Sequence, residues 1–400
     1  MPVALYALAA AAFGIGMAEF VVVGILPVIA GDMNVDIPTA GQLVSYYALG
    51  VAVAAPILTA LSSKYDRRKL TVGLMLLFAL ANLLTTLAPS YSLLLFGRVL
   101  AGVVQGVFYS IATVIAADLV SKDKSGRAIG IVFSGMTVAI VSGVPAGAFI
   151  TEWLNWRAAF ALISVLGFVS MVSLWFLLPA NLKRPKPASV FKQLSVIGVP
   201  RMLLVFLITG IGYGGSFIAY TYLSEILGKI TGFSTSAIGT ILIFYGIAVV
   251  FGNTYAAKWA DKQGPLKASA GIFISLALTL LLFGFVATNK YYVIPLVMIW
   301  GAAAFGSVPV LQLYVVQQAE KHFPQAIDAS SSMNIAAFNL GIAVGASVGG
   351  LVVTKYGLLA TAPAAAVVVA ISVLLIVYSS VLESKDSKKL AIQDRVNSNF

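Results

Sequence analysis

Two charged residues stand inside long apolar stretches of the sequence. Glu19 lies near the middle of the apolar run from Leu5 to Ile29, which is long enough to cross a lipid bilayer as a helix. Arg98 lies about two helical turns into a later apolar run. Ionisable side chains at such depth are expensive and usually belong to a substrate pathway or a proton relay. Glu19 and Arg98 are therefore the first candidates for chemistry.

The two residue types suggest a proton-coupling pair. An apolar environment disfavours the charged form of a carboxylate, so Glu19 can take up and release a proton near neutral pH. Arginine stays charged, so Arg98 can tune that carboxylate or bind an anionic group. Two simpler interpretations remain open. Glu19 can be a structural carboxylate that is permanently paired between helices, and Arg98 can extend to the nearer membrane surface.

Polar and aromatic side chains on other apolar runs are candidates for binding a small-molecule substrate. Each alone is more typical of a hydrogen bond between helices than of a ligand contact. Together they predict a mostly uncharged, aromatic pocket, which suits amphipathic or neutral polar solutes. The set is Tyr46, Gln105, Tyr109, Tyr213, Tyr220, Tyr245, Gln312, Asn334 and Asn339.

The sequence lacks the patterns of common enzymes and metal sites. It has no cysteine and a single histidine, His322, so thiolate chemistry and a multi-histidine metal site are excluded. It has no Gly-x-x-x-x-Gly-Lys phosphate-binding loop, which argues against ATP-driven pumping by this chain. We expect no catalytic residues, no metal and no cofactor. The expected energy source is the proton gradient.

The composition predicts an all-α integral membrane protein. Of its 400 residues, 60% are hydrophobic and only 10% are charged, which is too little charge for a water-soluble surface. Apolar runs long enough to span a bilayer recur along the whole chain. Twelve spans are predicted near residues 4–30, 41–62, 70–88, 92–118, 128–150, 157–179, 202–223, 236–257, 267–287, 291–316, 329–353 and 360–382.

A proline- and lysine-containing segment, Pro179 to Arg201, interrupts the rhythm of the spans. It divides the chain into a six-helix bundle at 1–180, a linker at 181–200, a second six-helix bundle at 201–383 and a tail at 384–400, which we expect to be disordered. Basic loops recur after spans two and eight. Such parallel repeats are typical of transporters that bind substrate between the halves.

The positions of the basic residues predict the orientation in the membrane. One side receives nearly all of them: Lys64–Lys69, Lys122–Arg127, Lys183–Arg201, Lys258–Lys267, Lys321 and Lys385–Arg395. The other side keeps only Arg157, Lys229, Lys290 and Lys355. By the positive-inside rule, both termini and the linker are cytoplasmic. The net charge of +11 is thus a topology signal rather than a sign of nucleic-acid binding. We expect a monomer in a bacterial inner membrane.

Several motifs resemble the major facilitator superfamily, and more narrowly its twelve-span drug–proton antiporter branch, near the arabinose-efflux and chloramphenicol-resistance type exporters. Glu19-Phe20 followed by Gly24–Pro27 is similar to the first-span signature of that branch. Arg98–Gly102 resembles the family's span-four motif, and Gly143–Gly147 resembles the antiporter motif of span five. Asn155–Arg157 resembles the usual start of span six. The resemblance implies two six-helix halves, and a role for Arg98 in proton transfer.

The resemblance also implies a set of gating residues. The loop after span two matches the gating motif only in part, because Ser63 and Asp66 replace its expected aspartate and central glycine. Asp66 or Asp118 can then serve as the acidic partner. The second copy, with Asp261 and Lys262, is closer to the family pattern. The full set is Asp66, Arg67, Arg68, Asp118, Gly143, Pro145, Gly147, Asp261 and Lys262. The glycines and proline of span five would form a pliable seam between the halves.

These features predict a proton-coupled exporter that works by alternating access. Its cargo would be a small amphipathic or neutral polar solute, such as a drug, a sugar or a nucleoside. A passive facilitator, in which Glu19 only hydrogen-bonds the cargo, is the main alternative. A non-transporting membrane receptor or scaffold is the alternative from another class.

Overall fold

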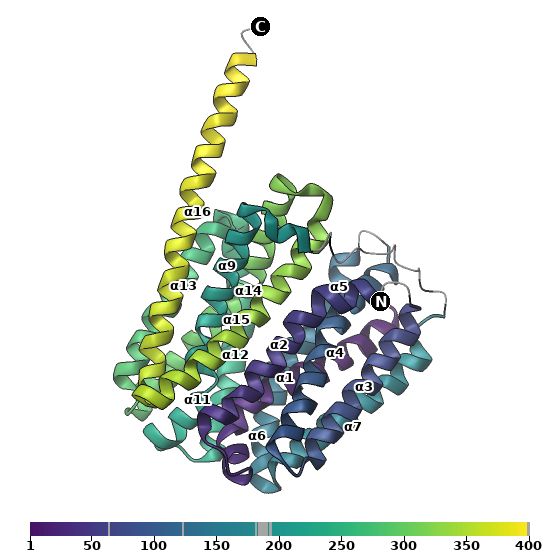
Figure 1. Ribbon diagram of the computed structural model, residues 1–400, viewed down its shortest axis with the longest axis vertical. Helices are drawn as coiled ribbons and strands as arrows, with labels where there is room; N and C mark the ends of the chain where they lie inside the picture. Colours follow the sequence, from purple (N-terminus) through teal and green to yellow (C-terminus); the bar gives the residue numbers. More distant parts are fainter. Residues whose placement is uncertain (63–64, 122–123, 181, 183–190, 192–193, 398–400) are drawn as a thin grey trace.

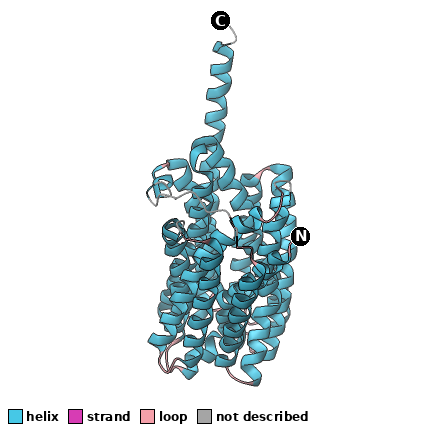
Figure 2. Cartoon of the chain, turned by 90° about the vertical axis from the view of Figure 1, so that its right-hand side faces the viewer, coloured by secondary structure: helices cyan, strands magenta, loops and turns pink. Residues whose placement is uncertain are grey.

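The computed structural model describes residues 1–62, 65–121, 124–180, 182, 191 and 194–397. Ser63, Lys64, Lys122 and the basic residues Lys183, Arg184, Lys186 and Lys192 of the linker lie outside these ranges. Within the ranges, every regular element is a helix (Figure 2). This agrees with the predicted all-α class.

Twelve helices, or runs of consecutive helices, in the described ranges are long and apolar enough to cross a membrane, which confirms the predicted number of spans. Three of the spans are composite: α5, η2 and α6 form the fifth, α9, α10, α11 and η4 form the seventh, and η6 with most of α16 forms the twelfth. The elements are α1 (Val3–Asp32), α2 (Ile37–Ser62), α3 (Arg67–Leu87), α4 (Tyr91–Asp118), α5 (Ser125–Val138), η2 (Ala139–Gly143), α6 (Val144–Trp153), α7 (Trp156–Leu177), η3 (Ser195–Gly198), α9 (Pro200–Gly215), α10 (Phe217–Tyr220), α11 (Leu223–Glu225), η4 (Ile226–Ile230), α12 (Thr235–Gln263), α13 (Pro265–Val286), α14 (Lys290–His322), η5 (Pro324–Ala326), α15 (Ile327–Tyr356), η6 (Leu358–Ala360) and α16 (Thr361–Asn397).

The helices pack in two groups, which we call the N-half (α1 to α7) and the C-half (α9 to α16). In the N-half, α3 packs on α4 and α7, and α1 packs on α5 and α7. In the C-half, α13 packs on α14 and α16, and α9 packs on α15. The main contacts between the halves join α2 to α15 and α6 to α12. Figure 1 shows the N-half in purple to blue and the C-half in teal to yellow.

The two halves touch at one end and separate towards the other. We call the end that carries both termini the terminal end, and the opposite end, where α6 and α11 lie, the distal end (Figure 1). At the distal end, the Ser236 hydroxyl donates to the Glu152 carboxylate at 2.6 Å across the two halves. Towards the terminal end, an apolar groove of about 710 Å³ separates α2 from α9 and α15, with Ile57, Leu203 and Met333 in its walls.

The tail differs from its prediction. The helix α16 does not end with the last span but continues to Asn397 and projects beyond the bundle (Figure 1). The expectation of disorder after residue 383 is therefore wrong. The physical reason is local, because residues 384–397 contain no glycine or proline and consist largely of residues that a helix tolerates well.

Candidate functional site

Glu19 is the first member of a hydrogen-bond chain that crosses three helices. Its carboxylate oxygen Oε2 on α1 accepts from the Gln105 amide of α4 at 2.8 Å. The carbonyl oxygen of the same amide accepts from the Tyr47 hydroxyl of α2 at 2.6 Å. An amide that donates at one end and accepts at the other is held in a single orientation. Tyr47 therefore fixes Gln105, and Gln105 presents its N–H group to Glu19.

Arg98 does not extend to the membrane surface, because its side chain is buried in the N-half with 1% of its surface exposed. Its guanidinium donates to the backbone carbonyl of Ala18 at 2.5 Å and to that of Leu43 at 3.4 Å. It also lies over the Tyr47 ring, 4.1 Å from the ring centroid. In the part of the chain that the structure describes, Arg98 and the Glu19 carboxylate form no ion pair. Arg98 thus cross-links α4 to the backbones of α1 and α2.

A close approach of α2 and α4 makes these contacts possible. A Cβ atom added to Gly102 would lie 2.1 Å from the Tyr47 carbonyl oxygen. Added to Gly50 or Gly106, it would lie 2.8 Å or 2.7 Å from the nearest carbonyl oxygen of the facing helix. Only glycine allows such close backbone contact. The glycine that ends the Arg98–Gly102 motif therefore sets the spacing at which Gln105 and Tyr47 meet.

The Glu19 side chain borders a small void between the two halves. The void measures about 10 Å³, and its walls include Glu19 and Tyr47 from the N-half and Phe217 and Ile342 from the C-half. That is about the space of one water molecule. Glu19 keeps 7% of its surface exposed. The carboxylate therefore faces the boundary between the halves rather than lipid.

Aromatic side chains of the C-half gather opposite Glu19. Tyr220 and Tyr245 stack with ring centroids 5.1 Å apart, and Tyr213 meets Phe305 edge to face at 5.7 Å. Phe20, the neighbour of Glu19, joins this cluster from the N-half through Phe305 at 5.5 Å. The structure thus brings the three predicted tyrosines of the C-half together. Sequence reasoning noted Phe20 only as part of the first-span signature and missed Phe305, because apolar aromatic residues in a membrane span carry no signal of such a cluster.

Two of the three predicted amides of the C-half, Gln312 and Asn334, bind each other. The Thr209 hydroxyl donates to the Asn334 carbonyl oxygen at 2.8 Å, and the Asn334 amide donates to Gln312 at 3.0 Å. Gln312 in turn donates to Ser331. These bonds tie α9, α14 and α15 together. Asn339 donates to the Ile335 carbonyl of its own helix. A role of these residues in binding cargo stays a prediction.

The other two predicted binding residues lie in the N-half. Tyr109 is buried, donates to the Ala12 carbonyl at 3.3 Å and stacks on Phe133. Tyr46 is 42% exposed and takes no part in the Glu19 chain, whereas its neighbour Tyr47 does. Consecutive residues on a helix point about 100° apart. Choosing between the two tyrosines requires the helical phase, which the sequence pattern of α2 did not reveal.

The gating residues around the loop after α2 have distinct contacts. Arg67 at the start of α3 pairs with Asp118 at the end of α4 at 2.5 Å, so Asp118 is the acidic partner. Asp66 instead caps α3, since its carboxylate accepts from the Lys69 N–H group at 2.9 Å. Arg68 donates to the Trp175 carbonyl on α7. In the second copy of the motif, Asp261 and Lys262 are exposed at the end of α12.

The glycine seam of span five differs from its prediction. A Cβ atom at Gly147 would lie 2.1 Å from Val21 of α1, and one at Gly143 would lie 3.2 Å from Met17. These glycines therefore pack α6 and η2 on α1, within the N-half and not between the halves. The contact with the C-half is made by Val141 and Phe149, which face glycines of α12. Pro145 lacks an N–H group and follows the π-helical turn η2, as expected where proline disturbs a helix.

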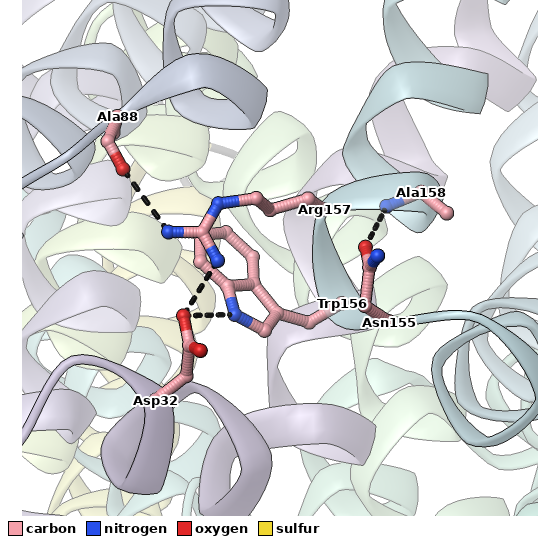
Figure 3. A network of polar contacts seen from close by, with 6 residues as sticks. All are labelled: Asp32, Ala88, Asn155, Trp156, Arg157 and Ala158. Atoms are coloured by element: carbon pink, nitrogen blue, oxygen red, sulfur yellow. Dashed lines mark hydrogen bonds and ion pairs between the residues drawn. The ribbon is translucent and has the colours of Figure 1, made fainter.

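The Asn155–Arg157 motif fastens the distal end of α1 to its neighbours (Figure 3). Asn155 caps α7 through the Ala158 N–H group. The Trp156 indole donates to the Asp32 carboxylate at 3.0 Å, and Arg157 pairs with the same carboxylate at 2.5 Å. Arg157 also donates to the Ala88 carbonyl at 3.3 Å. Three helices, α1, α3 and α7, are joined in this way.

Comparisons with known proteins agree with the geometry. A model of the Major Facilitator Superfamily matches residues 8–327 and 205–398. The chain is 41% identical to an MFS-type transporter, YtbD of Bacillus subtilis, over 96% of this chain and 97% of that one. It is 31% identical to the chloramphenicol resistance protein of Streptomyces lividans, over 86% of this chain and 88% of that one. Its fold is similar to that of a bacterial homologue of the human lysosomal transporter Spinster, with a TM-score of 0.77. The sequence identity is 16%, and the match covers 96% of this chain and 97% of that one.

Proposed function

The chain belongs to the major facilitator superfamily, and on that premise we propose that it is a proton-coupled exporter of small solutes. As a member of this family it is a multi-pass transporter of a bacterial inner membrane and not an enzyme. The distribution of basic residues supports a cytoplasmic position for the terminal end. The distal end would then face the outside of the cell. Membership of a transporter family disfavours the receptor or scaffold alternative.

One observation carries the proposal. A carboxylate in the middle of a membrane span, Glu19, borders a void walled by both halves and has no permanent cationic partner among the described residues. A carboxylate that is held by an amide rather than by a cation can still exchange a proton. Its place between the halves suits a group whose access alternates between two compartments.

The proposed cycle couples proton entry to cargo exit. With the distal end open, Glu19 takes a proton from outside and cargo leaves. With the terminal end open, Glu19 releases the proton to the cytoplasm and cargo binds in the space between the halves. The coupling arises because the two conformations differ in affinity for proton and for cargo. The described conformation is closed at the distal end, where Ser236 bonds Glu152 across the halves.

The cargo class follows from the aromatic cluster. Tyr213, Tyr220 and Tyr245 offer ring faces and few charges on the C-half side of Glu19. Such a surface suits amphipathic or neutral polar solutes, and the name of the Streptomyces relative points to an amphipathic antibiotic. Drugs, sugars and nucleosides are therefore the candidates for a first screen.

Reconstitution with a pH-sensitive dye inside the vesicles tests the proposal. Cargo would be found by screening an overexpressing strain for resistance to toxic sugars, purine analogues and antibiotics. In the parent, cargo movement should be accompanied by proton movement in the opposite direction. In Glu19→Gln the cargo-dependent pH change should vanish, because an amide cannot carry a proton through the cycle. Proton movement coupled to cargo at the parental rate in this variant would exclude Glu19 as the carrier.

A passive facilitator is the second candidate, since the Glu19 carboxylate could also accept a hydrogen bond from a cargo hydroxyl group. Uphill export distinguishes the two. A proton-coupled exporter lowers the internal cargo concentration below the external one, and an uncoupler abolishes this difference. A facilitator only equalises the two concentrations and is insensitive to the uncoupler.

A further inference from the structure

Span seven is interrupted where it reaches the distal end. The helix α10 ends at Tyr220 and α11 begins at Leu223, and the backbone between them forms a turn. The turn is closed by bonds to the preceding helix, including one from the Tyr222 N–H group to the Ala219 carbonyl at 3.0 Å. No proline lies in this segment. The Tyr222 backbone, at φ −106° and ψ 10°, departs from ordinary helical values.

Tyr222 fills a socket made of glycines from both halves. Its side chain is fully buried, with 0% of its surface exposed, and its hydroxyl donates to the Ala346 carbonyl of α15 at 3.0 Å. A Cβ atom at Gly41 of α2 would lie 2.3 Å from the hydroxyl oxygen, and one at Gly350 of α15 would lie 3.0 Å from it. A Cβ atom at Gly349 would lie 2.7 Å from the ring. The ring thus occupies space that any larger residue at these positions would take.

Further polar contacts join the halves around this socket. Ser224, two residues after Tyr222, donates to the Val23 carbonyl of α1 at 2.5 Å. Val23 lies one helical turn distal to Glu19 and lines the same small void. Ser347 of α15 donates to Ser45 of α2 at 3.0 Å. The socket therefore lies at the boundary of the halves, on the distal side of the proposed proton site.

We infer that Tyr222 is a positioning residue for the transport reaction: seated in the Gly41–Gly349–Gly350 socket, it holds the distal ends of the two halves together. The inference rests on the proposed alternating access. An opening of the distal end moves α2 away from α15, so Tyr222, whose bond to Ala346 lies within the C-half, must leave Gly41 of the N-half. Glycine at position 41 is then required because a side chain there would exclude the ring. The contact is lost on opening and regained on closing.

The natural chain lacks cysteine, so a single introduced thiol can report the opening. Val44→Cys places it beside the small void, where it is shielded from the distal side while the halves touch. Intact cells are exposed to a membrane-impermeant maleimide, and the labelling rate is measured. In this background we compare Tyr222→Phe, which removes only the hydroxyl, with Gly41→Ala. The matched control is Gly31→Ala on the same end, where an added Cβ meets nothing within 4 Å.

The hydroxyl is the Tyr222 atom nearest Gly41, and its bond to Ala346 holds the ring against α2. Tyr222→Phe removes both, so the labelling rate should rise a few-fold. Gly41→Ala should raise it at least as much, and Gly31→Ala should label at the parental rate. A parental rate in either of the first two variants, when folded, overturns the inference, as does an equal rise in the control. If Gly41→Ala does not fold, Tyr222→Phe decides. The assay needs neither cargo nor a proton gradient, so its failure is distinguishable from failure of the Glu19 proposal.

Discussion

Substitution of Gly102 by alanine should disrupt the hydrogen-bond chain of Glu19, Gln105 and Tyr47 without replacing any of these residues. The added Cβ would lie 2.1 Å from the Tyr47 carbonyl oxygen and 3.2 Å from the Tyr47 Cα atom. Ordinary contacts to a Cβ atom are about 3.4 Å or longer, so α2 must move by roughly 1 Å. Overpacking of this kind destabilises a protein by about 1–3 kcal/mol. Displacing Tyr47 from Gln105 removes a buried hydrogen bond and adds about 1 kcal/mol.

The expected loss of unfolding free energy for Gly102→Ala is therefore about 2–4 kcal/mol. Denaturant titration in mixed micelles, followed by circular dichroism, measures it. Gly73→Ala is the matched control, since an added Cβ there meets nothing within 4 Å and alanine favours a helix. Equal stability of Gly102→Ala and Gly73→Ala would refute a steric requirement for glycine at position 102. Cargo-coupled proton movement should fall in Gly102→Ala and persist in the control.

Three further substitutions test the contacts of the charged residues. Arg98→Lys should lose about 2–3 kcal/mol of unfolding free energy, because one ammonium group cannot reach the Ala18 and Leu43 carbonyls together; parental stability would contradict this. Asp118→Asn breaks a partly buried pair with Arg67 and should lower the unfolding free energy by about 1–2 kcal/mol. Adding Arg67→Met removes the unpaired charge, so the double variant should regain part of that loss. Asp32→Asn breaks a more exposed pair and should lose less than about 1 kcal/mol, so a larger loss than that of Asp118→Asn would reverse the expected order.

Much of the architecture followed from the sequence because the bilayer imposes a simple rule. A segment that crosses it must be helical, apolar and about 20 residues long, and twelve segments met that rule. Glu19 and Arg98 were recognisable for the same reason, since a charge inside such a segment needs an explanation. The partners of Arg98 were not recognisable. They are backbone carbonyls, which every residue carries and no sequence pattern marks.

Other features depended on helical phase and on close packing. Tyr46 and Tyr47 are equivalent in type, and only the rotation of α2 decides which of them reaches Gln105. The glycines of span five looked like a seam between halves, but the same composition serves equally well for packing within one half. The role of Tyr222 was not predicted, because residues 216–225 contain no proline or glycine that would indicate a break in the helix. In each case the deciding quantity is a distance between segments remote in sequence.

The arrangement around Glu19 bears on what Arg98 does. Had the guanidinium paired with the carboxylate, the two charges would have neutralised each other, and Glu19 would fit the role of a structural carboxylate. Instead, Arg98 directs its donors to the backbone carbonyls of Ala18, Glu19 and Leu43 and its charge to the Tyr47 ring. It thereby positions the tyrosine that orients Gln105, and Gln105 is the group that contacts Glu19. Arg98 thus contacts the Glu19 backbone directly at 3.5 Å and bears on the Glu19 side chain through Tyr47 and Gln105. The Glu19 carboxylate has a hydrogen-bond donor in Gln105 and no cation paired with it among the described residues, an arrangement that the proposed proton cycle can use.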